Sequence, residues 1–102
     1  MGRIADALDW LDSRLDANVS LAELYAITGL RRRQTIAAFQ RATGLPPHAW
    51  HLQRRIGRVK RLLRQGMPVA IAAVETGFAD QSHMGRHFLA ITGLTPAAYA
   101  RG

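Results

Sequence analysis

The side chains best suited to metal binding or acid–base chemistry are four histidines, at positions 48, 51, 83 and 87. His83 and His87 lie four residues apart, a spacing that can place two metal ligands on one face of a helix. No glutamate follows His83 and no third ligand is near, and His48 and His51 are expected on the surface or in a helix cap. The chain also has no cysteine and no glycine-rich phosphate loop. We therefore expect no metal, no cofactor and no enzyme activity.

A second set of side chains offers hydrogen-bond donors at helical spacing. On an expected helix over residues 81–92, the polar side chains nearest the start are Gln81, Ser82, His83 and Arg86. In the major groove of DNA, Arg86 could pair with guanine and Gln81 with adenine. On an expected helix over residues 32–43, the corresponding face is partly apolar, and its exposed positions are Arg32, Arg33, Ile36, Ala37 and Gln40. The alternative is that both are ordinary solvent-exposed helix faces.

The chain contains two copies of one sequence pattern, which would present both sets in the same way. Residues 21–30 have the sequence LAELYAITGL and match VAIAAVETGF at residues 69–78, with an offset of 48. Residues 39–50, FQRATGLPPHAW, match FLAITGLTPAAY at residues 88–99, with an offset of 49. A one-residue difference in the turn between two matching stretches is typical of two copies of one supersecondary unit.

Each copy is expected to form a short helix, a tight turn and a longer helix. Ser20 and Glu23 form a capping-box pattern that predicts a helix start at residue 21. Gly29 and Gly77 are expected to end the two short helices, because glycine accepts the left-handed conformation of a C-terminal cap. Asp80 is a good N-cap for the second long helix.

The remaining segments also predict helices. A first helix is indicated by apolar residues at helical spacing, namely Ile4, Leu8, Leu11 and Leu15. A long basic helix is expected over about residues 47–65, between Pro47 and the stop signals Gly66 and Pro68. A short helix begins at Pro96. The sequence therefore predicts an all-α fold in one domain, with a first helix-turn-helix copy at about 1–46, the linker helix at 47–65 and a second copy at about 66–102.

Charge is distributed unevenly along the chain. The net charge of +7 combines a balance of −3 over residues 1–30 with +10 over residues 31–102. This favours a polyanion as partner, although a basic surface that only keeps the protein in solution is an alternative. Four aspartates in the first 20 residues argue against a signal peptide, and no apolar stretch approaches the ~18 residues of a membrane span. Together with the absence of cysteine, this predicts a cytoplasmic protein without membrane contact.

A basic helical module for RNA or for a protein partner is the other interpretation. RNA recognition uses exposed aromatic rings, whereas the aromatic side chains here are expected mostly at packing positions, namely Trp10, Tyr25, Phe39, Trp50, Phe78, Phe88 and Tyr99. A module that binds only protein does not need such a positive charge. Double-stranded DNA is therefore the favoured partner.

Two segments resemble a known family. Residues 77–99, GFADQSHMGRHFLAITGLTPAAY, resemble the C-terminal signature of AraC/XylS-type transcription regulators, and residues 48–63, HAWHLQRRIGRVKRLL, resemble their linker helix. The resemblance covers nearly the whole chain. It implies seven helices in two helix-turn-helix subdomains, control of transcription initiation, and contact with RNA polymerase.

The resemblance also implies roles for single residues. It places base contacts at Gln81, Ser82, His83 and Arg86, and in the first copy around Arg32, Arg33, Ile36 and Ala37. We expect phosphate contacts from Arg31, Arg41, Arg54 and Arg58, and no small-molecule ligand in this domain. The chain departs from the family at three positions of the first copy, where serine-like, leucine and arginine residues are usual, namely Arg31, Thr35 and Ala37.

Overall fold

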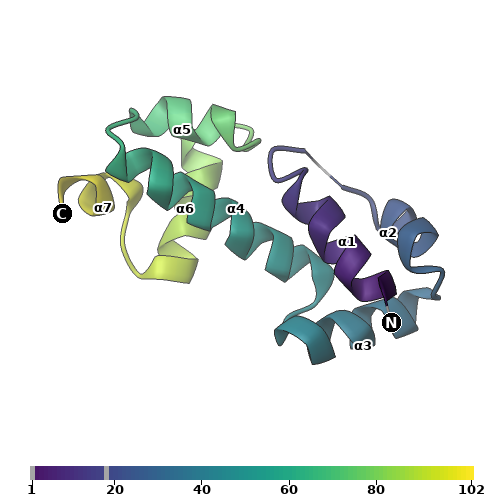
Figure 1. Ribbon diagram of the computed structural model, residues 1–102. Coiled ribbons are helices and arrows are strands. Elements are labelled where there is room, and N and C mark those ends of the chain that lie inside the picture. The colour runs from purple at the N-terminus through teal and green to yellow at the C-terminus, as the bar shows by residue number, and fades with distance from the viewer. Residues whose placement is uncertain (1, 18) are drawn as a thin grey trace. The chain divides into compact units, whose positions relative to one another are not determined.

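The computed structural model describes residues 2–17 and 19–102, and over those residues it consists of seven α-helices without β-strands (Figure 1). The all-α prediction is confirmed. Met1, where the expected first copy begins, and Asn18 lie outside the described residues. The helices are α1 (Gly2–Asp12), α2 (Leu21–Thr28), α3 (Arg32–Thr43), α4 (Pro47–Arg64), α5 (Val69–Glu75), α6 (Gln81–Thr92) and α7 (Pro96–Arg101).

The helices form two compact units, which we call unit 1 (Met1–Leu52) and unit 2 (Gln53–Gly102). The division falls within α4, so each unit holds one helix-turn-helix and one part of the expected linker helix. Helix α4 ends at Arg64, one residue before the expected end. The organisation of both copies as a single domain stays a prediction.

Unit 1 is built around a small apolar core. Ala7 and Leu11 of α1, Leu24 of α2 and Phe39 of α3 are each at most 2% exposed. The ring of Trp50, at the start of α4, packs edge-on against Phe39 with the ring centroids 6.3 Å apart, a favoured geometry for aromatic pairs. Helix α1 contacts both α2 and α3. The first helix therefore covers the first helix-turn-helix, as its apolar periodicity predicts.

Unit 2 has a core of its own, which also contains an edge-on aromatic pair. Met84 and Phe88, four residues apart on one face of α6, are fully buried. The ring of Phe88 meets that of Tyr99 on α7 edge-on at 5.5 Å. The small side chains of Ala72 and Ala73 are also fully buried, which allows α5 to lie close to α6. The part of α4 in this unit contributes the apolar side chains Ile56, Val59 and Leu63.

Two N-terminal caps predicted from the sequence are present. The backbone N–H of Glu23 donates to the Ser20 hydroxyl at 3.3 Å, and the Glu23 carboxylate accepts from the Ser20 N–H at 3.3 Å. This reciprocal pair is the capping box that starts α2. At the start of α6, the Asp80 carboxylate accepts from the backbone N–H of His83 at 2.7 Å. Both caps fix where a helix begins at the edge of a turn.

The short helices end at glycines, also as predicted. Gly29 follows α2 with φ of 69°, and its N–H donates to the Tyr25 carbonyl at 2.8 Å. Gly77 has φ of 83° and lies two residues after the end of α5, where the Phe78 N–H donates to the Ala73 carbonyl at 3.0 Å. Such a bond, together with a left-handed glycine, is the Schellman arrangement, and it turns the chain toward α6.

Candidate nucleic-acid interface

The turn between α2 and α3 is fixed by a pair of threonines. Thr28, the last residue of α2, and Thr35, in the first turn of α3, are both fully buried, and their hydroxyl oxygens lie 3.2 Å apart. The Thr28 oxygen also accepts from the backbone N–H of Leu30 at 3.2 Å, and the Thr35 hydroxyl donates to the Leu30 carbonyl at 3.4 Å. The pair therefore satisfies polar groups of the turn and sets how α3 leaves α2.

In unit 2, the turn between α5 and α6 contains one buried threonine in place of a pair. Thr76, the equivalent of Thr28, is fully buried, and its hydroxyl donates to the Ala72 carbonyl at 2.8 Å. The equivalent of Thr35 is Met84, which is also fully buried. The family usually has leucine at the position of Thr35. A leucine there could not form a hydrogen bond with Thr28, whereas the hydroxyl of Thr35 does. The partnership of Thr35 with Thr28 needs tertiary contact, and sequence reasoning missed it.

The start of α3 is capped from an unexpected residue. Arg31 provides no side-chain cap, but its backbone N–H donates to the side-chain oxygen of Gln34 at 3.2 Å. This is the second half of a capping box, the half that the residue at the third helical position supplies. A glutamine at that position is the sequence signal for it.

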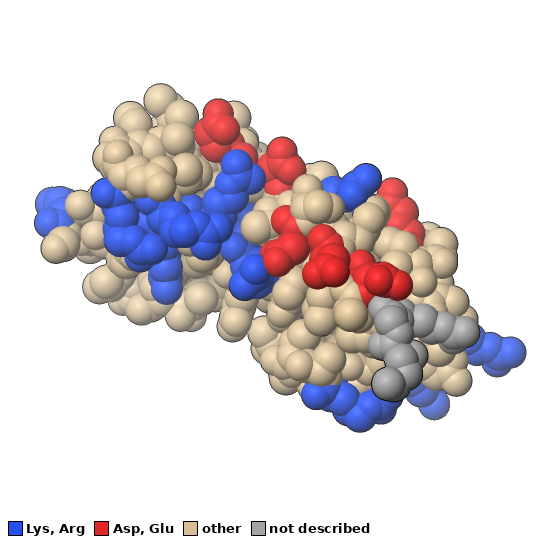
Figure 2. Space-filling view, in the orientation of Figure 1, with Lys and Arg blue, Asp and Glu red and all other residues tan. Residues whose placement is uncertain are grey.

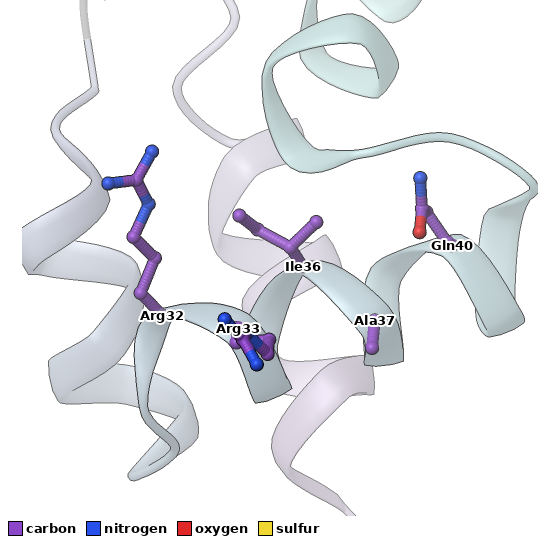
Figure 3. Close-up of a pocket in the computed structure, with 5 residues that line it drawn as sticks. All are labelled: Arg32, Arg33, Ile36, Ala37 and Gln40. Atoms are coloured by element: carbon purple, nitrogen blue, oxygen red, sulfur yellow. The ribbon is translucent and has the colours of Figure 1, made fainter.

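The side chains of α3 predicted to contact bases share one surface of unit 1. Arg32, Arg33 and Gln40 are exposed, and Ile36 and Ala37 are half-buried between them. These five side chains line an open hollow of about 540 Å³ (Figure 3). A second hollow of about 330 Å³ shares Arg33 and Ala37 and extends to Arg41. The structure thus brings the whole predicted set of α3 together, with long polar side chains around short apolar ones.

On α6, three of the four predicted side chains point away from the core of unit 2. Gln81, Ser82 and Arg86 are exposed within the first two turns of the helix. His83 is half-buried, and its ring packs edge-on against Phe78 with centroids 5.6 Å apart. In the described structure its Nδ1 atom is buried without a hydrogen-bond partner. Any base contact by His83 therefore uses Nε2.

Arg55 lies where the sequence did not place it. The linker helix was expected to be basic, but Arg55 within it is only 7% exposed, and its guanidinium lies 5.1 Å above the ring of Phe78. A cation over an aromatic face is attracted to the ring, and more strongly when water is excluded. Because Phe78 also contacts His83 and His87, Arg55 helps to position the start of α6.

The expectation that His51 lies on the surface or in a cap is wrong. His51 is 9% exposed, and its Nε2 atom lies 3.0 Å from the backbone carbonyl of Arg14. It therefore ties α4 to the segment that follows α1, 37 residues earlier in the chain. His48, one turn before it, is exposed as expected.

The four arginines predicted to contact phosphates are divided between the two units. Arg31 and Arg41, at the two ends of α3, are exposed, as is Arg54 on α4, and Arg58 is half-buried. Figure 2 shows Lys and Arg side chains gathered over α4 in unit 2, and Asp and Glu side chains gathered over α1 in unit 1. On this face the basic side chains thus lie over the linker helix, and α1 is acidic, as the charge distribution predicts.

The two histidines of α6 lie next to each other, with ring centroids 5.0 Å apart. Within residues 2–17 and 19–102, no group of three or more His, Asp or Glu side chains is placed to hold a metal ion together. Over the same residues, each helix is too short or too polar to cross a bilayer.

Comparison with known proteins agrees with this geometry. A family model described as "Helix-turn-helix domain" matches residues 24–102. The uncharacterized HTH-type transcriptional regulator YbfI of Bacillus subtilis is 36% identical over 76 residues, which are 74% of this chain and 28% of that protein. The arabinose operon regulatory protein of Escherichia coli is 28% identical over 102 residues, which are 98% of this chain and 35% of that protein. The chain thus spans about a third of the length of these relatives.

A solved structure extends the comparison to three dimensions. The DNA-binding domain of AdpA, a global transcriptional factor crystallised with a target DNA, superposes with a TM-score of 0.88 at 27% sequence identity, covering 97% of this chain and 90% of that one. The resemblance of the sequence to AraC/XylS-type regulators is confirmed. This chain belongs to the AraC-type family of helix-turn-helix domains, which bind DNA in transcriptional regulators.

Proposed function

We propose that this chain binds double-stranded DNA sequence-specifically and serves a bacterial transcription regulator. The main observation behind this proposal is that α3 and α6 occupy equivalent positions in the two copies. Both helices are 12 residues long, with an offset of 49 residues, and both follow a short helix and a tight turn. Each exposes hydrogen-bond donors along its first turns, where a second helix of a helix-turn-helix contacts base edges. We propose that the two helices occupy adjacent major grooves, ~34 Å apart along the duplex.

Side chains of α3 and α6 contact bases, and arginines near them contact phosphates. Arg86 suits guanine and Gln81 suits adenine, because each can form two hydrogen bonds with that base. The other base contacts we assign to Ser82 and His83 in unit 2 and to Arg32, Arg33, Ile36, Ala37 and Gln40 in unit 1. Arg31, Arg41, Arg54 and Arg58 contact phosphates, which position the protein without specifying sequence.

Further partners follow from this role. A bacterial transcription regulator works in the cytoplasm, on DNA, and RNA polymerase is its second partner. The domain needs no cofactor, metal, small-molecule ligand or membrane for DNA binding, and we assign it no catalytic activity. The family membership of residues 24–102 supports this assignment.

Selection from a random pool of duplex DNA tests the proposal. The purified chain should enrich an asymmetric site with two short blocks about one helical turn apart, and its affinity should fall steeply as salt rises. Arg86→Ala should weaken binding by ~1–3 kcal/mol and remove the preference at one base pair of one block only. Arg101→Ala, in the short last helix, is the matched control and should leave that preference unchanged. Weak binding without an enriched sequence would refute specific recognition and favour a protein partner or RNA.

A further inference from the structure

The surface of α3 has a feature that the surface of α6 lacks. The hollow on α3 is lined by two apolar side chains, Ile36 and Ala37, which we call the floor, and by the polar side chains of Arg32, Arg33 and Gln40. Figure 3 shows that Arg32, Ile36 and Gln40, each four residues from the next, point to one side of the helix, whereas Ala37 points to another side. Both side chains of the floor are half-buried, so part of each remains accessible.

The offset of 49 residues shows what unit 2 has at the same positions. Gly85 takes the place of Ile36, and Arg86 takes the place of Ala37. Gly85 has no side chain, and a Cβ atom there would come within 4.0 Å of Pro96. Unit 2 thus offers a long donor where unit 1 offers an apolar surface. The two helices cannot recognise the same base-edge chemistry, although their backbones are equivalent.

The major groove offers few partners for an apolar floor. Base edges there carry hydrogen-bond donors and acceptors, and the one apolar group among the four common bases is the C5-methyl of thymine. An aliphatic side chain gains by covering a methyl group, whereas it would desolvate a donor or acceptor without replacing the lost hydrogen bond.

We infer that Ile36 and Ala37 recognise C5-methyl groups in the half of the site bound by α3. This inference rests on the proposed function and specifies its ligand for unit 1. The flanking donors Arg32, Arg33 and Gln40 contact the neighbouring base edges, so the methyl group lies on the floor and polar groups lie at the rim. Because 5-methylcytosine carries its methyl group at the same ring position, the floor recognises methylated cytosine as well.

Removing or adding one C5-methyl group in the DNA tests the inference. The duplex selected by the chain is resynthesised with deoxyuridine in place of one thymine at a time, which removes only the methyl group. At one or two thymines of one block, Kd should rise about fourfold, the value for one buried methyl-sized group. Replacing the same thymine–adenine pair by cytosine–guanine and then methylating the cytosine should lower Kd again by about fourfold.

The variant Ile36→Ala shows whether α3 detects the methyl group. In that variant, thymine and deoxyuridine should bind almost equally at the position that Ile36 contacts, and so should cytosine and 5-methylcytosine. A methyl group contacted by Ala37 should instead lose its effect in Ala37→Gly. Gln40→Ala, on the same face of α3, is the matched control and should keep the fourfold difference even if overall affinity falls. The primary comparison uses the unchanged protein, so it does not depend on how a variant folds.

The outcomes separate the inference from the proposed function. Failure to enrich any site would overturn the proposed function and this inference with it. An enriched site at which every thymine can be replaced by deoxyuridine without a change in Kd would overturn the inference alone. A methyl effect that persists unchanged in both Ile36→Ala and Ala37→Gly would also overturn it, because another part of the protein would then contact the methyl group.

Discussion

The buried threonine pair of unit 1 gives the sharpest test of how the turn is held. We consider Thr35→Val, which replaces a hydroxyl by a methyl group of nearly the same size. Thr35 is fully buried, so the change leaves no cavity and gives water no access to its former partners. What it removes is the contact with Thr28 at 3.2 Å and the bond to the Leu30 carbonyl at 3.4 Å.

The structure sets the expected size of the effect. Two hydrogen bonds are lost, each with a net contribution of ~0.5–1.5 kcal/mol, and the added buried methyl offsets ~0.8 kcal/mol. Thr35→Val should therefore destabilise unit 1 by up to ~2 kcal/mol, with a central value of ~1 kcal/mol. Thr28→Val should cost more, ~2–3 kcal/mol, because the Leu30 N–H loses its acceptor as well. The double variant should cost ~1 kcal/mol less than the sum, because the bond between the two hydroxyls is lost only once.

Tryptophan fluorescence is the suitable assay. Both tryptophans of the chain, Trp10 and Trp50, belong to unit 1, so their emission follows the unfolding of that unit in urea. Free energies from the linear extrapolation are compared for the wild type, the two single variants and the double variant. Far-UV circular dichroism of the same samples reports on both units together.

The cycle can also refute the reasoning. If the two substitutions add within ~0.3 kcal/mol, the threonines are not coupled and the turn is held by other contacts. If Thr35→Val is as stable as the wild type, the hydroxyl contributes nothing that a methyl group does not. DNA binding by the Thr35→Val variant at low temperature, where it remains folded, shows whether the pair also sets the angle of α3.

Three further predictions concern α4, α6 and the phosphate contacts. Gly57→Ala should raise the stability by ~0.5–1 kcal/mol in thermal unfolding, because the new Cβ meets no atom within 4 Å among the described residues, whereas Gly66→Ala, at φ of 90°, should lower it. Asp80→Ala should lower the stability in urea by ~1 kcal/mol through loss of the α6 cap, and Asp80→Asn should retain most of it. Arg41→Gln should reduce the slope of log K against log salt by ~0.9 without changing the selected sequence, and an unchanged slope would remove Arg41 from the phosphate contacts.

The sequence by itself determined the helices and most of their bounds, although α1 ends at Asp12, before Leu15, which its apolar spacing included. Caps, prolines and glycines act on residues within one turn of the chain, so Ser20, Gly29, Pro47 and Asp80 mark helix ends wherever the helix later packs. The repeat offset then placed α3 and α6 in equivalent positions. The aromatic residues Phe39 and Phe88 were expected at packing positions, and both are buried in the two cores.

Only the tertiary structure decided which polar side chains of the helices are buried and which distant residue each of them contacts. Arg55 looked like one more arginine of a basic helix, yet it lies over Phe78, 23 residues later in the sequence. His51 meets a carbonyl 37 residues earlier, and Thr35 is paired with Thr28 across the turn. Periodicity separates apolar from polar faces, but it cannot indicate a polar side chain whose burial depends on one distant partner. Such partners exist only after the helices have packed, because a buried polar group is stable only where a specific neighbour satisfies it.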